Sequence, residues 1–199
     1  MPLFRKKPPK RLTLEAQLRT LAANGINLNP GRTVDDLLIS FPRERFESVP
    51  YELLVIMLGS EVESRPCGRH FTDFIYTFDA ECIEDHGDYR AQLRPLTRIA
   101  GGDLPIEVIR DAIDVDAGTA RIEFTLDDRP HKFEPTIYDD WFDCQVISWL
   151  DTLLTSRDST RRYFILDNSG DQNLVVLCTT PHLITKLVKA TGLQFHRTN

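Results

Sequence analysis

The pattern of apolar and polar positions predicts helices in the first sixty residues. Between Thr13 and Gly25, leucines recur at three- and four-residue intervals, which is the spacing of one helical face. Thr13 is a suitable N-cap and Gly25 a suitable stop. A shorter helix is predicted over 33–41, before Pro42. The segment 51–59 is apolar at almost every position, so it fits either a third helix or a buried strand.

Aromatic and β-branched residues predict strands in the middle of the chain. The segment 71–78 reads as one strand, with alternate aromatic side chains on one side. Further strands are predicted at about 108–116, 119–127 and 131–137, because turn-forming Asp, Gly and Pro residues separate them. The alternation over 120–126 is the cleanest strand signal in the chain.

The remaining elements are predicted from the same signals. Helices are expected over 89–100, 143–155 and 180–191, and strands over 162–167 and 173–179. Pro95 should kink the first of these helices or mark its true start, and residues 168–171 form a hairpin turn. Since helices and antiparallel hairpins come in blocks, the predicted class is α+β: a mainly antiparallel sheet with helices packed on it. We expect one compact domain over 12–199, preceded by a mobile basic arm over 1–11.

Composition places the chain among ordinary globular proteins. It has 199 residues, of which 41% are hydrophobic and 27% charged. The longest apolar run, 53–58, falls short of the about 20 residues that span a bilayer. No hydrophobic signal core follows the basic start, so a cytoplasmic location without membrane attachment is expected. The cysteines are widely spaced and are expected to be reduced thiols. They are Cys67, Cys82, Cys144 and Cys178.

Charge is distributed unevenly around a net value of −6. The arm 1–11 holds five Lys and Arg and no acid, whereas 73–143 holds 18 Asp and Glu against 7 Lys and Arg. A body this acidic repels nucleic acid and favours a basic protein partner. The arm could touch RNA or an anionic membrane, but its prolines fit a disordered, solubilising tail. The oligomeric state stays open.

Two segments combine acids with aromatic residues. The first, 78–89, packs five carboxylates, a thiol and an imidazole behind an apolar run, and the second is 138–144. Crowded carboxylates repel one another, so a metal ion, a helix N-terminus, a basic partner or water must offset the cost. Sequence alone leaves open whether the two segments meet.

Zinc is one candidate for the first segment. Cys67, His70, Cys82 and His86 have ligand spacings close to those of structural zinc sites. However, the predicted strand between His70 and Cys82 would hold the two pairs more than about 30 Å apart. No zinc site is therefore expected unless a turn is hidden in that strand.

A metal-dependent hydrolase is the alternative function. Its ligands would be Asp79, Glu81, Glu84 and His86, since hard cations favour carboxylate oxygens. Against it, no Lys or Arg lies beside the cluster to hold a phosphate, and no Gly-rich phosphate loop occurs. The acids could equally lie in the first turn of a helix, where they interact favourably with the positive end of its dipole.

Nucleophilic catalysis has weaker support. No GxSxG motif occurs, and the carboxylates around Cys82 should raise the pKa of its thiol even if His86 lies one helical turn away. We therefore expect no catalytic residues and no cofactor.

These segments resemble small acidic immunity proteins that protect bacteria from polymorphic or contact-dependent toxins. The resemblance covers about residues 50–195 and rests on 78–89, 111–116, 140–143 and 191–192. It implies a protein that binds one cognate toxin domain, has no catalytic residues and carries its partner-binding residues in the acidic segments. The basic arm is a departure from that pattern.

The sequence thus predicts a non-enzymatic acidic binding protein, most simply an immunity protein that neutralises a basic toxin such as a nuclease. Carboxylates and aromatic side chains would cover the partner's basic site. The predicted partner-binding residues are Asp79, Glu81, Glu84, Asp85, Asp88, Asp139, Asp140 and Trp141.

Overall fold

The computed structural model describes residues 12–63, 69–167 and 172–197, within which the chain forms seven α-helices, one 3₁₀ helix and seven strands. The helices are α1 (Leu14–Ala23), α2 (Val34–Ser40), α3 (Arg43–Ser48), α4 (Glu52–Gly59), α5 (Asp88–Ala100), η1 (Gly101–Asp103), α6 (Gln145–Ser156) and α7 (Pro181–Thr191). The strands are β1 (Ile75–Asp79), β2 (Glu107–Asp114), β3 (Thr119–Leu126), β4 (Arg129–Phe133), β5 (Arg162–Leu166), β6 (Asn173–Thr179) and β7 (Phe195–His196).

The strands form two antiparallel sheets. One has four strands in the order β1-β6-β5-β7, and the other has three in the order β2-β3-β4. Strand β6 lies inside the larger sheet and is apolar on both faces. Since successive residues of a strand point to opposite faces, Val175 and Leu177 enter one core while Val176 and Cys178 enter the other.

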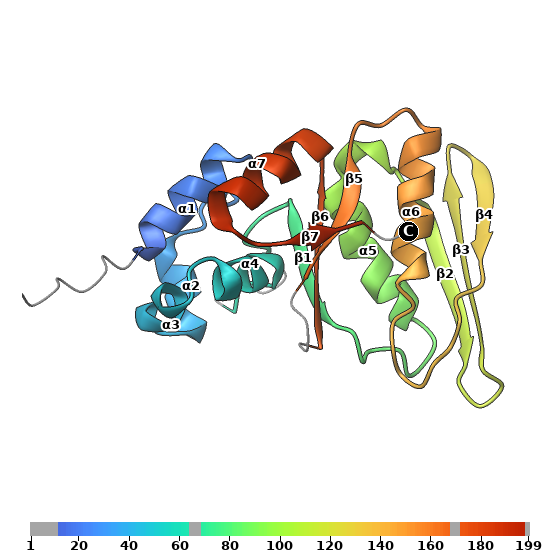
Figure 1. The fold of residues 1–199 in the computed structure, drawn as a ribbon. Helices are drawn as coiled ribbons and strands as arrows, with labels where there is room; N and C mark the ends of the chain where they lie inside the picture. Colours follow the sequence, from blue (N-terminus) through green and yellow to red (C-terminus); the bar gives the residue numbers. More distant parts are fainter. Residues whose placement is uncertain (1–11, 64–68, 168–171, 198–199) are drawn as a thin grey trace, which may run out of the picture.

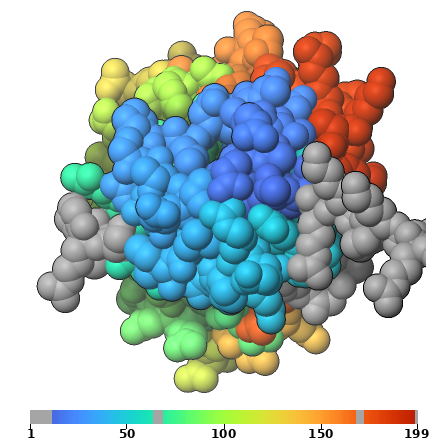
Figure 2. Space-filling view, turned by 90° about the vertical axis from the view of Figure 1, so that its left-hand side faces the viewer, coloured from blue at the N-terminus to red at the C-terminus, as the bar shows by residue number. Residues whose placement is uncertain are grey.

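The molecule is built in four layers (Figure 1). Helices α1–α4 and α7 cover one face of the larger sheet; we call the core between them the helix-side core. Helices α5 and α6 lie between the larger sheet and β2-β3-β4; we call the core around them the sheet-side core. Figure 2 shows the outer face of the first layer, with α7 beside α1–α4. No described helix combines the length and apolar character that a membrane span requires.

The expected α+β class in a single compact domain is confirmed. The ambiguous segment 51–59 is helical, as α4. The strand predicted over 71–78 is shorter, since only Ile75 to Asp79 pairs with β6. Pro95 lies inside α5, so the reading that it marks the start of the helix is wrong. The arm 1–11 and the turn 168–171 lie outside the described residues.

Besides the single-turn η1, two elements were not predicted, and both have a physical reason. Helix α3 has six residues and buries mainly Phe46, so it has too few apolar positions to show a helical period. Strand β7 has two residues, and it is defined by pairing with Ile165 and Leu166 of β5. Such a short pairing has no signal of its own in the sequence.

Candidate partner-binding surface

The two acid-aromatic segments adjoin. The backbone N–H groups of Cys82 and Ile83 both donate to the carbonyl of Asp140, each at 2.9 Å. In return, the N–H of Phe142 donates to the carbonyl of Ala80 at 2.7 Å. The chain therefore pairs 80–83 with 140–142 across about sixty residues of sequence, and it brings both groups of carboxylates onto one surface.

The second segment makes a tight turn that carries its acids outward. The N–H of Trp141 donates to the carbonyl of Tyr138 at 3.1 Å, which places Asp139 and Asp140 at the tip. Asp139 has a φ of 55°, a left-handed conformation that Asp tolerates better than most residues. Tyr138 and Trp141 flank the tip with exposed fractions of 77% and 40%.

Bridge pairing brings an acid beside these aromatic side chains. Glu81 lies opposite Trp141, and Tyr138 also lies opposite Trp141, both as antiparallel bridges. Residues directly opposite in such a pair present their side chains on the same side. We call the set formed by the two segments the acidic-aromatic surface; its predicted contact residues are Asp79, Glu81, Glu84, Asp85, Asp88, Asp139, Asp140 and Trp141.

Buried rings anchor this surface from below. Phe142 is 4% exposed, and its ring centroid lies 5.1 Å from that of Phe78 and 5.5 Å from that of Tyr89. Asp143 then accepts hydrogen bonds from the N–H groups of Thr136 at 2.8 Å and Gln145 at 2.9 Å. Asp143 thus stabilises the chain at the start of α6, whose N-cap is Cys144, while Asp139 and Asp140 are left for other contacts.

Carboxylates also shape the first segment. Asp79 accepts a hydrogen bond from the N–H of Glu81 at 2.9 Å. Asp88, the first residue of α5, is half-buried and accepts from the N–H groups of Glu84 and Asp85, both at 2.8 Å. Asp88 therefore contributes mainly to the loop itself, whereas Glu84 and Asp85 are exposed to solvent.

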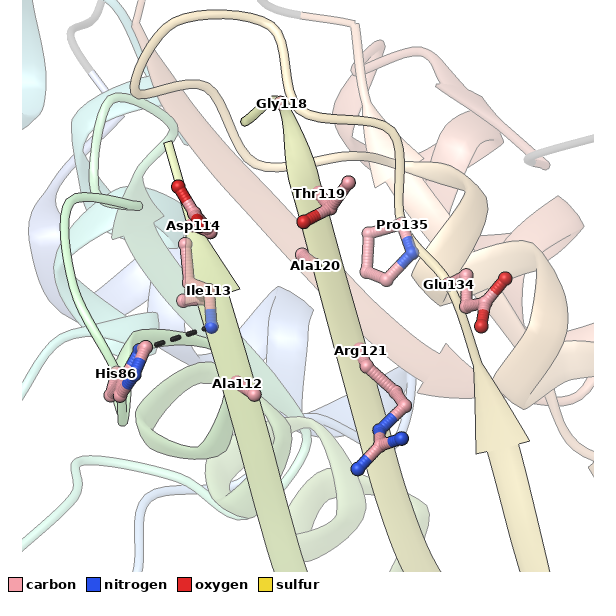
Figure 3. Close-up of a pocket in the computed structure, with 10 residues that line it drawn as sticks. All are labelled: His86, Ala112, Ile113, Asp114, Gly118, Thr119, Ala120, Arg121, Glu134 and Pro135. Carbon is pink, nitrogen blue, oxygen red and sulfur yellow. Dashed lines mark hydrogen bonds between the residues drawn. The ribbon is translucent and has the colours of Figure 1, made fainter. Parts of the chain in front are cut away.

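Asp111, which the sequence did not single out as a functional residue, attaches this loop to the three-stranded sheet. Asp111 of β2 accepts hydrogen bonds from the N–H groups of Gly87 at 3.0 Å and Arg90 at 3.1 Å. Beside it, His86 Nδ1 accepts from the N–H of Ile113 at 3.1 Å (Figure 3). No local signal marks Asp111 for this role, because the helix start that it caps lies more than twenty residues earlier.

The carboxylates of the surface have few internal counter-charges. Among the described residues, no Lys or Arg forms an ion pair with any of the seven predicted contact acids. Asp85 accepts a hydrogen bond from the backbone N–H of His86 at 2.6 Å, and Glu81 accepts one from the side chain of Gln172. The negative potential is therefore directed largely to solvent.

The Cys82 thiol lies within this field. Burial, and then the charges of Asp88, Asp79 and Asp140, raise the pKa of Cys82 to about 12. The residues around it do not form a helical turn, so Cys82 and His86 do not form the thiolate–imidazolium pair that one turn would allow. A thiol with so high a pKa is a poor nucleophile at neutral pH.

The metal hypotheses gain no support from the geometry. In the part of the chain that the structure describes, no group of three or more His, Cys, Asp or Glu side chains is placed to hold a metal ion. The four ligands expected for a metal-dependent hydrolase thus do not converge on one point; they are Asp79, Glu81, Glu84 and His86. Cys67, a ligand of the zinc hypothesis, lies outside the described residues.

A pocket of about 470 Å³ opens over β2 and β3, next to His86 (Figure 3). Its charged side chains already have partners. Arg121 pairs with Glu123 at 3.2 Å, and Glu134 pairs with Lys132. Asp114 accepts a hydrogen bond from a backbone N–H of the β2–β3 turn at 2.9 Å. These pairings leave the pocket without an obvious reactive group.

Comparison of the chain with protein-family models, with curated proteins and with solved structures found no match.

Proposed function

We propose that the protein is a non-enzymatic binding protein that docks a basic protein partner on the acidic-aromatic surface. The observation that carries the proposal is the backbone pairing of 80–83 with 140–142. This pairing joins two acidic segments that are distant in sequence, and it holds Trp141 and Tyr138 exposed among their carboxylates.

The surface has the physical properties of a docking site for cations. Unpaired carboxylates attract a basic partner over a distance and speed its encounter. An exposed Trp or Tyr then supplies a large contact area, and its ring face attracts Lys and Arg side chains. Because Phe142 anchors the turn, the surface is held in shape before the partner arrives.

We further propose that the partner is a toxin domain, and that the protein neutralises it as an immunity protein does. The support is the resemblance of the acidic segments to such proteins. A nuclease toxin fits the chemistry, since a groove that binds nucleic acid is basic and complements a carboxylate-rich surface.

The first test is whether a reading frame next to the gene encodes a basic toxin domain; such a domain is then the partner for binding kinetics. Stopped-flow association should slow markedly as salt rises, because screening shortens the range of the attraction. The double variant Glu81→Lys with Asp140→Lys should slow association by at least about tenfold at low salt. Trp141→Ala should mainly accelerate dissociation.

Glu52→Lys is the matched control. Glu52 is an exposed acid at the start of α4, in the helix layer on the other face of the larger sheet, and its substitution changes the net charge in the same sense. If this control slows association as much per unit of charge as the substitutions in the surface do, the association rate depends on the net charge of the protein and not on the acidic-aromatic surface. An association rate that is independent of salt would refute the mechanism.

A further inference from the structure

A second, more apolar pocket lies on the opposite side of the larger sheet from the sheet-side core. It has a volume of about 330 Å³ and opens between the end of α1, helix α7 and strand β6. Its walls are mostly apolar and come from Ile26, Phe74, Leu177, Leu183 and Leu187. A pocket of this size and lining is typical of small-molecule sites.

Arg161 lies at the edge of this pocket and is the only charged side chain among the described residues that line it. It is half-buried, and its Nη1 and Nη2 donate to the carbonyls of Ala100 at 3.0 Å and Cys178 at 2.9 Å. A guanidinium has five N–H groups, so these two bonds fix its position without using all its donors.

No described carboxylate forms an ion pair with Arg161. The two carbonyls that it contacts carry no full charge. The Ala100 carbonyl ends α5 and adds the partial negative charge of a helix C-terminus, which leaves the guanidinium without a full counter-charge. A half-buried Arg at an apolar pocket is favourable when an anion completes it.

The start of α7 adds to the same preference. Thr179 and Thr180 line the pocket, and Thr180 caps α7 by accepting a hydrogen bond from the N–H of Leu183 at 3.3 Å. The positive end of the helix dipole therefore lies at the wall of the pocket, beside residues that also offer hydroxyl groups. Charge and hydrogen-bonding capacity are both suited to an anionic group.

We propose that this pocket binds a small apolar monocarboxylate, with its carboxylate on Arg161 and its hydrocarbon portion between Phe74 and the leucines of α7. A monoanion matches the single positive charge, whereas a phosphate dianion would leave one charge without a partner in a mostly apolar site. The pocket near His86 does not compete for this role, because its charged side chains are already paired.

Sodium octanoate and 1-octanol provide a matched pair of probes, equal in chain length and different in charge. Octanoate should raise the melting temperature of the protein and shift the backbone amide resonances of Thr179 and Leu183 in ¹H–¹⁵N NMR spectra. The alcohol should bind about tenfold more weakly, since it lacks the charge-assisted hydrogen bonds to Arg161.

Two variants test separately how the charge of Arg161 and the apolar pocket contribute to binding. Arg161→Gln should remove the preference for octanoate over octanol. Because Arg161 also holds two carbonyls, Leu183→Trp provides a second variant that fills the pocket from α7 and leaves Arg161 intact; it should abolish binding of both probes. The proposal is overturned if neither probe binds wild type, if octanol binds as tightly as octanoate, or if folded Leu183→Trp still binds octanoate.

Discussion

At the scale of single residues, Gly59 allows α4 to lie directly against the edge strand β1. A Cβ atom at this position would be 2.7 Å from the backbone N of Thr77 and 2.9 Å from Cγ2 of Ile75. Real Cβ atoms do not approach backbone atoms so closely, so only Gly fits without a shift of the helix or the strand. The contact involves residues far apart in sequence, so the apolar pattern of 51–59 could not reveal it.

Gly59→Ala should therefore lower the free energy of unfolding by about 1–3 kcal/mol, although Ala normally stabilises a helix relative to Gly. Urea denaturation measures the effect. Gly102→Ala is the control, because a Cβ there meets nothing within 4 Å and its φ is not positive; it should change stability by less than about 0.5 kcal/mol. Equal effects at the two positions would show that the close packing of α4 on β1 is not important.

Cys82 provides a second prediction at this scale. With a pKa raised to about 12, the thiol is almost fully protonated at pH 8, and alkylation requires the thiolate. Iodoacetamide should modify Cys82 in the folded protein at least about a hundredfold more slowly than in urea at the same pH. Peptide mapping by mass spectrometry identifies the modified residue, and rapid labelling of folded Cys82 would contradict the predicted pKa shift.

At the scale of elements, the start of α5 is stabilised from another part of the chain. Its N-cap is Gly87, with a φ of 105° and no side chain to accept a hydrogen bond. Asp111 of β2 supplies the missing acceptor. This single carboxylate thus links the helix, the acidic loop before it and the three-stranded sheet.

Asp111→Ala should destabilise this junction by about 1–2 kcal/mol, as the loss of an N-cap does. Hydrogen exchange should accelerate first at the amides of Gly87 and Arg90, which lose their acceptor. Asp116→Ala, in the following turn, should leave both exchange rates unchanged. Uniformly faster exchange over the whole of α5 and the larger sheet would instead indicate global destabilisation.

Elements with local signals were predictable from sequence. Thr13 and Thr180 cap α1 and α7 as expected, since each hydroxyl accepts a hydrogen bond three residues later in the chain. The hairpin between β3 and β4 turns at Asp127 and Asp128, which both have positive φ, as the turn-like sequence indicates.

The sequence located the acids and Trp141 of the candidate surface but not their arrangement. The meeting of 80–83 with 140–142 depends on packing between two distant segments: the ring of Phe142 lies against the rings of Phe78 and Tyr89. Periodicity and turn signals are local, so they carry no information on such a meeting.

At the scale of the whole molecule, the larger sheet separates two cores that share its strands. Val175 and Val176 of β6 are both fully buried, yet they face the helix-side core and the sheet-side core respectively. Both tryptophans lie on the sheet-side half of the molecule. Trp149 stacks on Phe133, with ring centroids 4.9 Å apart, and Trp141 directly precedes Phe142, which is buried in the sheet-side core. Tryptophan fluorescence therefore reports on one half of the molecule, while far-UV circular dichroism reports on both.

Because both cores depend on β6, they should unfold together. Val175→Ala and Val176→Ala should each lower the free energy of unfolding by about 1–3 kcal/mol. In both variants, the urea transitions measured by fluorescence and by circular dichroism should coincide. If Val175→Ala shifts only the circular dichroism transition, the helix-side half unfolds independently and the shared sheet does not couple the cores.

The position of β6 along the chain has a consequence for biosynthesis. Helices α1 to α6 all precede β6, yet its side chains complete both cores. A polypeptide that emerges from the ribosome therefore exposes the apolar faces of these helices until β6 has left the exit tunnel. Nascent chains stalled before Asn173 should accordingly bind ribosome-associated chaperones, and release should follow the emergence of that strand.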